Sequence, residues 1–186
     1  MTNPAETDAL ILRLATGDKA ALDALWQLHG RGIRALGTRF LGTAEGGDEI
    51  LQETFLRVWQ KADSFAPERG SGKVWLYTIA RNTARDQLRR QRLRWLVGLD
   101  ALPTEPEAPI AGPEATADAR ARLARVQTEI LDLPDTQRMA LLLATIADLD
   151  TPAIAAIMGR SRGAVEQLIV RARKRLRMKI EDDTDG

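Results

Sequence analysis

The sequence predicts an all-α protein built from two small helical domains joined by an acidic, proline-rich linker. Ala, Leu, Arg, Glu and Gln dominate its 186 residues, and the apolar–polar alternation typical of strands is hard to find. Half of the eight prolines fall in one acidic stretch that has few large apolar residues: Pro103, Pro106, Pro109 and Pro113. Because proline donates no backbone hydrogen bond and disfavours helix in the residue before it, we expect an extended linker there.

This linker sets the predicted domain boundaries. We expect an N-terminal domain over residues 1–97, the linker over 98–116, a C-terminal domain over 117–180 and an acidic tail over 181–186. A linker of this composition predicts that the two domains reorient freely unless a partner holds them.

Three helices are expected in the N-terminal domain. The first is capped by Asp18 and the second begins at Asp48, where Gly46 and Gly47 loosen the approach. The third follows the loop SFAPERGSG. Their apolar faces carry, in turn, Leu22, Leu25, Trp26, Ile33, Leu36 and Phe40; Leu51, Phe55, Val58 and Ala62; and Leu76, Ile79, Ala80, Thr83, Ala84 and Leu88.

The C-terminal domain ends in the pattern of a helix-turn-helix. One helix covers about 117–131, and Pro134 can open the next, which runs to about Ala147. Asp150 or Thr151 then caps the short apolar helix that contains AIAAIM. Gly159 ends this helix and Ser161 caps a longer basic one, so the order is helix, glycine turn, basic helix.

The basic helix has one apolar stripe and one polar face. At 100° per residue the stripe consists of Val165, Leu168, Ile169, Ala172 and Leu176. The positions that meet base edges in a major groove are Arg162, Glu166, Gln167 and Arg171. Later cations suit phosphates: Arg173, Lys174 and Arg177. The alternative is an amphipathic helix whose cations only keep it soluble and offset its dipole.

Charge and composition exclude several classes of protein. The net charge of +1 hides a segregation, because no Lys or Arg lies between Arg94 and Arg120 while arginines cluster on both sides. Cysteine is absent, which excludes disulfides and Cys-ligated metal sites, and the single histidine, His29, is expected to be structural or on the surface. No metal-ligand spacing, phosphate-binding glycine loop or catalytic constellation is found, so we expect no cofactor, no metal and no enzyme.

Targeting signals are also missing from the sequence. No run of about 18 apolar residues exists, and the acidic N-terminus lacks the positive flank of a secretory signal. We therefore expect a soluble cytoplasmic protein without membrane insertion.

Two N-terminal segments leave two interpretations open. VWLYTIARNTARDQLRRQRLRW pairs aromatics with cations, as single-strand binders do, but Trp75 and Leu76 can equally be core and the arginines a solvated helix end. DEILQETFLRVWQKA is either a docking face anchored by Trp59 and Arg57 or a helix whose early acids suit its dipole.

Together, DEILQETFLRVWQKADSFAPERGSGKVWLYTIARNTARDQLRR and LPDTQRMALLLATIADLDTPAIAAIMGRSRGAVEQLIVRARKRLR resemble the two conserved blocks of extracytoplasmic-function (ECF) sigma factors of bacterial RNA polymerase. The resemblance implies an alternative sigma factor whose partners are core RNA polymerase, promoter DNA and an anti-sigma factor. It implies polymerase contacts by Asp48, Glu49, Gln52, Glu53, Arg57, Trp59 and Gln60. It implies contacts with the melted −10 element by Phe65, Arg81, Asn82, Arg85, Asp86 and Arg89. It implies −35 contacts by Arg160, Ser161, Arg162, Gly163, Glu166, Gln167, Arg171, Arg173 and Lys174.

One position departs from the pattern of the family. Many members carry a basic residue where this chain has Glu166, which removes a phosphate contact and can instead face a cytosine. Two other functions remain open from the sequence. A sigma-like decoy that sequesters an anti-sigma factor is disfavoured because both basic patches are retained. A stand-alone helix-turn-helix regulator leaves the N-terminal block unexplained.

Overall fold

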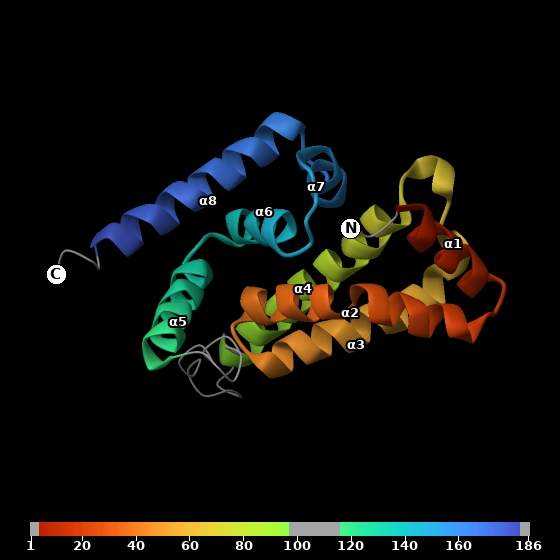
Figure 1. The fold of residues 1–186 in the computed structure, drawn as a ribbon, viewed down its shortest axis with the longest axis horizontal. Coiled ribbons are helices and arrows are strands. Elements are labelled where there is room, and N and C mark those ends of the chain that lie inside the picture. Colours follow the sequence, from red (N-terminus) through yellow and green to blue (C-terminus); the bar gives the residue numbers. More distant parts are fainter. Residues whose placement is uncertain (1–3, 97–115, 183–186) are drawn as a thin grey trace.

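The computed structural model describes residues 4–96 and 116–182, and these residues form α-helices joined by short turns (Figure 1). The predicted all-α fold is thus confirmed for them. The helices are α1 (Pro4–Ala15), α2 (Lys19–Leu41), α3 (Ala44–Lys61), α4 (Gly72–Leu96), α5 (Ala117–Leu131), α6 (Asp135–Thr145), α7 (Thr151–Met158) and α8 (Arg162–Asp182). Of two 3-10 turns, Pro67–Arg69 lies in the predicted loop before α4, and Ala62–Ser64 overlaps that loop only at Ser64.

Helices α1 to α4 form the N-terminal half, in which α2, α3 and α4 run side by side (Figure 1). The expected apolar faces point inward, and Leu25, Ile33, Leu36 and Phe40 of α2 are fully buried. No helix was expected before Asp18, yet α1 is present and packs against α2, α3 and α4. Its signal was the buried set Leu10, Ile11 and Leu14, at helical spacing.

The start of α3 corrects two expectations. The helix begins at Ala44 rather than at Asp48, because the Thr43 hydroxyl accepts a hydrogen bond from the Gly46 N–H and caps it earlier. Gly46 and Gly47 therefore do not loosen the approach to the helix. They lie buried in its first turns, where the absence of side chains lets α3 approach α2 closely.

Helices α5 to α8 form the C-terminal half, and their caps lie at the expected residues. Pro134 is the N-cap of α6, and Asp150 caps α7 by accepting from the Ala153 N–H at 2.9 Å. Gly159 ends α7 in the left-handed region with φ 62°, and the Ser161 hydroxyl accepts from the Ala164 N–H at 3.3 Å. The helix-turn-helix predicted from the sequence is present.

The two halves contact one another, contrary to the expectation that they reorient freely. Apolar residues of both halves form one continuous buried cluster, and α4 packs against α7 while α2 packs against α5 and α6. The predicted linker lies, apart from Thr116 at the start of α5, outside the described residues. In the predicted tail, α8 continues to Asp182.

Arg138 of α6 is the central polar residue of this contact. The residue is only 6% exposed, and its Nη1 donates to the Phe40 carbonyl oxygen of α2 at 2.7 Å. Its Nη2 donates to the carbonyl oxygens of Leu131 and Leu133, and its guanidinium lies over the Phe40 ring, 5.4 Å from the centroid. Burial lowers the pKa of Arg138, and the nearby Asp135 carboxylate opposes this shift.

Two further polar contacts join the halves. The Gln127 side-chain amide donates to the Arg39 carbonyl oxygen of α2 at 3.3 Å. The Arg92 guanidinium of α4 forms two hydrogen bonds of 2.9 Å with the two carboxylate oxygens of Asp135. The second pair is exposed, so we attribute the stability of the contact mainly to apolar burial and Arg138.

Candidate nucleic-acid interface

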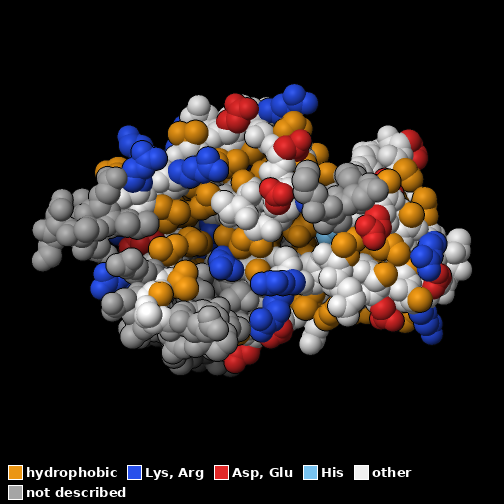
Figure 2. Space-filling view, viewed as in Figure 1, with side chains coloured by type: hydrophobic (Ala, Val, Ile, Leu, Met, Phe, Trp, Pro, Cys, Tyr) orange, Lys and Arg blue, Asp and Glu red, His pale blue; other side chains and the backbone are white. Residues whose placement is uncertain are grey.

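The N-terminal turns of α8 present a polar face to solvent. Val165, Ile169 and Ala172 are buried against α6 and α7, and Leu168 and Leu176 are half-buried, which confirms the predicted apolar stripe. Every predicted −35 residue is exposed: Arg160 and Ser161 in the turn before α8, and Arg162, Gly163, Glu166, Gln167, Arg171, Arg173 and Lys174 on α8 itself. Figure 2 shows Lys and Arg side chains along α8 above hydrophobic ones.

The geometry of this face suits a duplex groove. The preceding α7 is packed on α8 and ends in a glycine, so the N-terminus of α8 projects from a fixed support. A Cβ added at Gly163 meets nothing within 4 Å, which shows that the space before this turn is open. Guanidinium, carboxylate and amide groups that face outward can read base edges by hydrogen bonding.

The predicted −10 residues on α4 are partly engaged with one another. Arg81 is half-buried, and its Nη1 donates to the Asn82 Oδ1 at 2.9 Å. Burial, and then the guanidiniums of Arg85 and Arg160, lower the pKa of Arg81. Asn82, Arg85 and Arg89 are exposed on the same stretch of helix.

Two of the predicted residues instead hold α3 against α4. The Arg57 Nη1 donates to the Asp86 carboxylate at 3.1 Å, and its Nε donates to Glu53 at 2.7 Å. Burial opposes these contacts, but the hydrogen bonds raise the pKa of Arg57 overall. The structure thus connects a predicted polymerase residue with a predicted −10 residue through one guanidinium.

Phe65 lies in the core rather than on the surface of its loop. It is 7% exposed, and its ring centroid is 5.6 Å from that of Trp75. In this arrangement Phe65 supports the loop, and contact with a base requires the loop to rearrange.

A mixed apolar and polar face runs along α3. Trp59 is 54% exposed and Leu56 is 44% exposed, and Gln52 and Gln60 are exposed beside them. Leu56 was not among the residues predicted from the sequence, although its spacing from Trp59 places both on one side of the helix. Exposed large apolar residues that share a helix face are typical of protein interfaces.

The acidic residues at the start of α3 are paired within the protein. The Arg34 Nε donates to Asp48 at 2.5 Å, and this hydrogen bond lowers the pKa of Asp48. The Glu49 carboxylate accepts from the Gln87 amide of α4 at 2.6 Å. These contacts align α3 with α2 and α4 and leave the face of Trp59 and Leu56 as the exposed part of the helix.

Within the described ranges, His, Cys, Asp and Glu side chains form no group that could hold a metal ion. None of the described helices is long and apolar enough to cross a membrane. His29 is buried and bonded to the Thr7 hydroxyl at 2.9 Å, which agrees with a structural role.

Comparison with known proteins gives consistent matches along both halves. The family model described as Sigma-70 region 2 matches residues 25–94, and the model described as Sigma-70, region 4 matches residues 123–176. The chain is 34% identical over 179 residues to RNA polymerase sigma factor NccH of Alcaligenes xylosoxydans xylosoxydans, covering 95% of each chain. It is 31% identical over 166 residues to ECF RNA polymerase sigma factor RpoE of Cereibacter sphaeroides, covering 86% of each chain.

Two solved structures share the fold. CnrH in complex with the cytosolic domain of CnrY matches with a TM-score of 0.73 and 27% identity, over 96% of this chain and 99% of that one. The sigma factor RpoE in complex with the anti-sigma factor NepR from Bartonella quintana matches with a TM-score of 0.71 and 24% identity, over 86% and 96%.

Proposed function

The chain belongs to the extracytoplasmic-function (ECF) sigma factors. On this basis we propose which helices contact promoter DNA and which contact RNA polymerase during transcription initiation. It is an alternative sigma factor, an initiation factor rather than an enzyme, that binds core RNA polymerase and directs promoter recognition and melting. The main observation in support of this assignment is the exposed polar face at the start of α8, directly after α7.

The α8 face is assigned to the −35 element as duplex DNA. Glu166 and Gln167 meet base edges there, since an amide pairs with adenine and a carboxylate accepts from cytosine. Arg171 meets a base edge one turn later, and the later cations Arg173 and Lys174 contact phosphates and fix the register of the helix. Arg160, Ser161, Arg162 and Gly163 lie at the turn, where the helix enters the groove.

Helix α4 and the loop before it are assigned to the melted −10 element. Asn82, Arg85 and Arg89 are exposed and contact the displaced strand, while Arg81 orients Asn82 through their hydrogen bond. Holding an unstacked base offsets the cost of opening, which is a few kcal/mol per base. Asp86 holds α4 against α3 through its hydrogen bond with Arg57, and Phe65 supports the loop.

The α3 face is assigned to core RNA polymerase. Trp59 and Leu56 supply apolar contact, and Gln52 and Gln60 supply hydrogen bonds. Asp48, Glu49, Glu53 and Arg57 hold the helix in position against its neighbours.

A protein partner is assigned to regulation. CnrH is known in complex with a cytosolic domain of CnrY, and RpoE in complex with the anti-sigma factor NepR, which supports an anti-sigma factor for this chain. We place the protein in the cytoplasm, together with RNA polymerase.

Reconstituted transcription tests the assignment. Purified chain and core polymerase should start transcripts at a defined set of promoters, and sequencing the 5′ ends should reveal shared −35 and −10 elements. The same reaction with Trp59→Ala should lose transcription and polymerase binding together. Polymerase binding without opening of any promoter contradicts the proposal and favours a sequestering role.

A further inference from the structure

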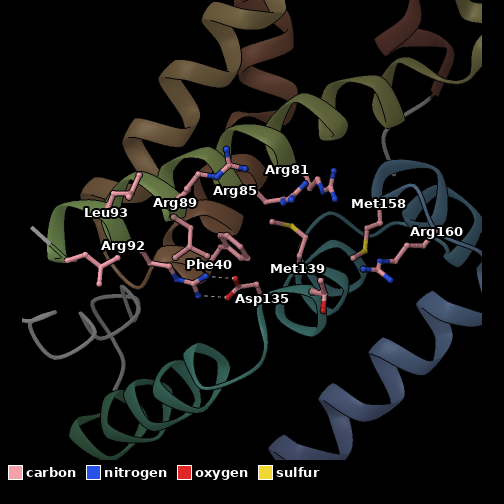
Figure 3. Close-up of a pocket in the computed structure, with 13 residues that line it drawn as sticks. Phe40, Arg81, Arg85, Arg89, Arg92, Leu93, Asp135, Met139, Met158 and Arg160 are labelled. Atoms are coloured by element: carbon pink, nitrogen blue, oxygen red, sulfur yellow. Dashed lines mark hydrogen bonds and ion pairs between the residues drawn. The ribbon is translucent and has the colours of Figure 1, made fainter.

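A cavity of about 390 Å³ lies between the two halves, under α4 and against α6 and α7 (Figure 3). Its apolar lining includes Phe40, Met139 and Met158. Its polar lining includes Arg81 and Arg85 of α4 and, from the turn before α8, Arg160. Ligand sites occur preferentially where domains meet, and this volume is at the lower end of their usual range of about 300–1,000 Å³.

The cavity carries positive charge that the protein does not neutralise. Asp135 is the one carboxylate among the described lining residues, and both its oxygens are bonded to Arg92. Neither Arg85 nor Arg160 forms an ion pair within the part of the chain that the structure describes. Guanidiniums that converge without a counter-charge favour an anion between them.

Arg81 also has a side-chain donor without a partner. Its Nε is buried and has no hydrogen-bond partner. Burial, and then the neighbouring cations Arg85 and Arg160, lower its pKa. Arg81 lines the cavity, and phosphate oxygens there can offset the repulsion among these cations, because guanidinium forks match phosphate geometry.

We propose that this cavity binds a small organic polyphosphate, with its phosphates on Arg81, Arg85 and Arg160 and its apolar or planar body on Phe40, Met139 and Met158. An acidic helix of a partner fits the charge but is about 10–12 Å across with its side chains, so the small volume favours a compact ligand. Nucleoside triphosphates have this combination of charge and planar body.

The site has a regulatory consequence, which rests on the function proposed above. The phosphate contacts come from both halves, so the ligand binds only when the halves are together. By linkage it stabilises that arrangement. The same arginines are assigned to −10 and −35 DNA, and the ligand therefore competes with promoter binding.

Calorimetric titration of the full-length chain with GTP, and separately with inorganic pyrophosphate, tests the site. GTP should bind saturably and more tightly than pyrophosphate, because only GTP has a body that fills the apolar lining. Arg81→Gln and Arg160→Gln should each weaken GTP binding by about tenfold or more. Arg90→Gln is the matched control: it removes the same charge from an exposed position of α4 outside this cavity and should bind like the wild type.

Several results overturn the proposal. These are no saturable binding at millimolar GTP, equal weakening by all three variants, or binding of an acidic helical peptide but of neither phosphate probe. Should Arg81→Gln fail to fold, the exposed Arg160 carries the test alone. Transcription by the ligand-free holoenzyme separates the two questions, since its failure counts against the sigma role and a null titration counts against the cavity.

Discussion

His29 is the single histidine of the chain, and its surroundings make it an acid-sensitive residue. It is 3% exposed, bonded to Thr7 and packed edge-on to Tyr77. Burial, assisted by the charge of Lys73, lowers the pKa of His29 to about 4. In the unfolded chain the ordinary value of about 6.5 returns, so the unfolded state binds the extra proton first as the pH falls.

We therefore expect the free energy of unfolding to decrease between pH 6.5 and 4, by about 3 kcal/mol in all from this residue. Urea unfolding across this range measures it. His29→Gln keeps a hydrogen-bonding group beside Thr7 and should flatten the curve in this window. Carboxylates with lowered pKa values, such as Asp48, reduce the free energy of unfolding when they are protonated, which happens below this range. An equally steep curve for the variant contradicts the assignment.

In the proposed −35 contact, Gln167 is the residue at which we expect base reading to be most specific. It is exposed on the outward face of α8, one position after Glu166. Gln167→Ala should relax the choice of base at one −35 position by about 1–3 kcal/mol, because a bidentate amide contact is lost. Holoenzyme competition against a promoter library measures this effect. Uniform weakening across the library indicates a backbone contact instead.

At the scale of elements, the packing of α2 on α3 depends on glycine. A Cβ at Gly47 falls on the Thr38 hydroxyl and 2.9 Å from the Arg34 carbonyl oxygen, and backbone cannot easily give way. Gly47→Ala should destabilise the protein by about 1–3 kcal/mol. Gly163→Ala is the control for stability, since open space surrounds it and alanine favours helix by about 1 kcal/mol. Thermal unfolding of both variants distinguishes steric overlap from helix propensity.

The elements also show how far the sequence predicts this molecule. Caps at Asp18, Asp150 and Ser161 were predictable because capping is local chemistry, and so were the helix-turn-helix and its apolar stripe. The start of α3 was not, because the glycines that looked like a break are used for close packing. The exposed polar face of α8 followed from periodicity.

Long-range pairing escaped prediction. The bonds of Arg57 to Asp86 and of Arg92 to Asp135 join residues 29 and 43 positions apart, which no local pattern encodes. The burial of Phe65 depends in the same way on its contact with Trp75.

At the scale of the whole molecule, Arg138 links the stability of the fold to the arrangement of its halves. Arg138→Met keeps the bulk but removes three charged hydrogen bonds, so we expect a loss of about 2–4 kcal/mol in unfolding free energy. Arg125→Met, on the exposed side of α5, should change it by less than about 0.5 kcal/mol.

The same variant should loosen the two halves. Because the chain has no cysteine, spin labels can be placed on a Cys pair at the exposed positions Arg31 and Arg175. The distance distribution between them should be narrow in the wild type and broad in Arg138→Met. A narrow distribution in both shows that apolar packing alone holds the halves together.

Carbonyl groups in the last turn of α2 accept hydrogen bonds from side chains of the C-terminal half. The carbonyls at Arg39 and Phe40 accept from Gln127 and Arg138, and helix ends otherwise leave such carbonyls to solvent. Separation of the halves thus frays this turn, and the amide protons of residues 39–42 should exchange with deuterium faster whenever the molecule opens. The amide-exchange rate at the end of α2 therefore reports how often the two halves separate. Exchange mass spectrometry can measure it in the unlabelled, wild-type protein.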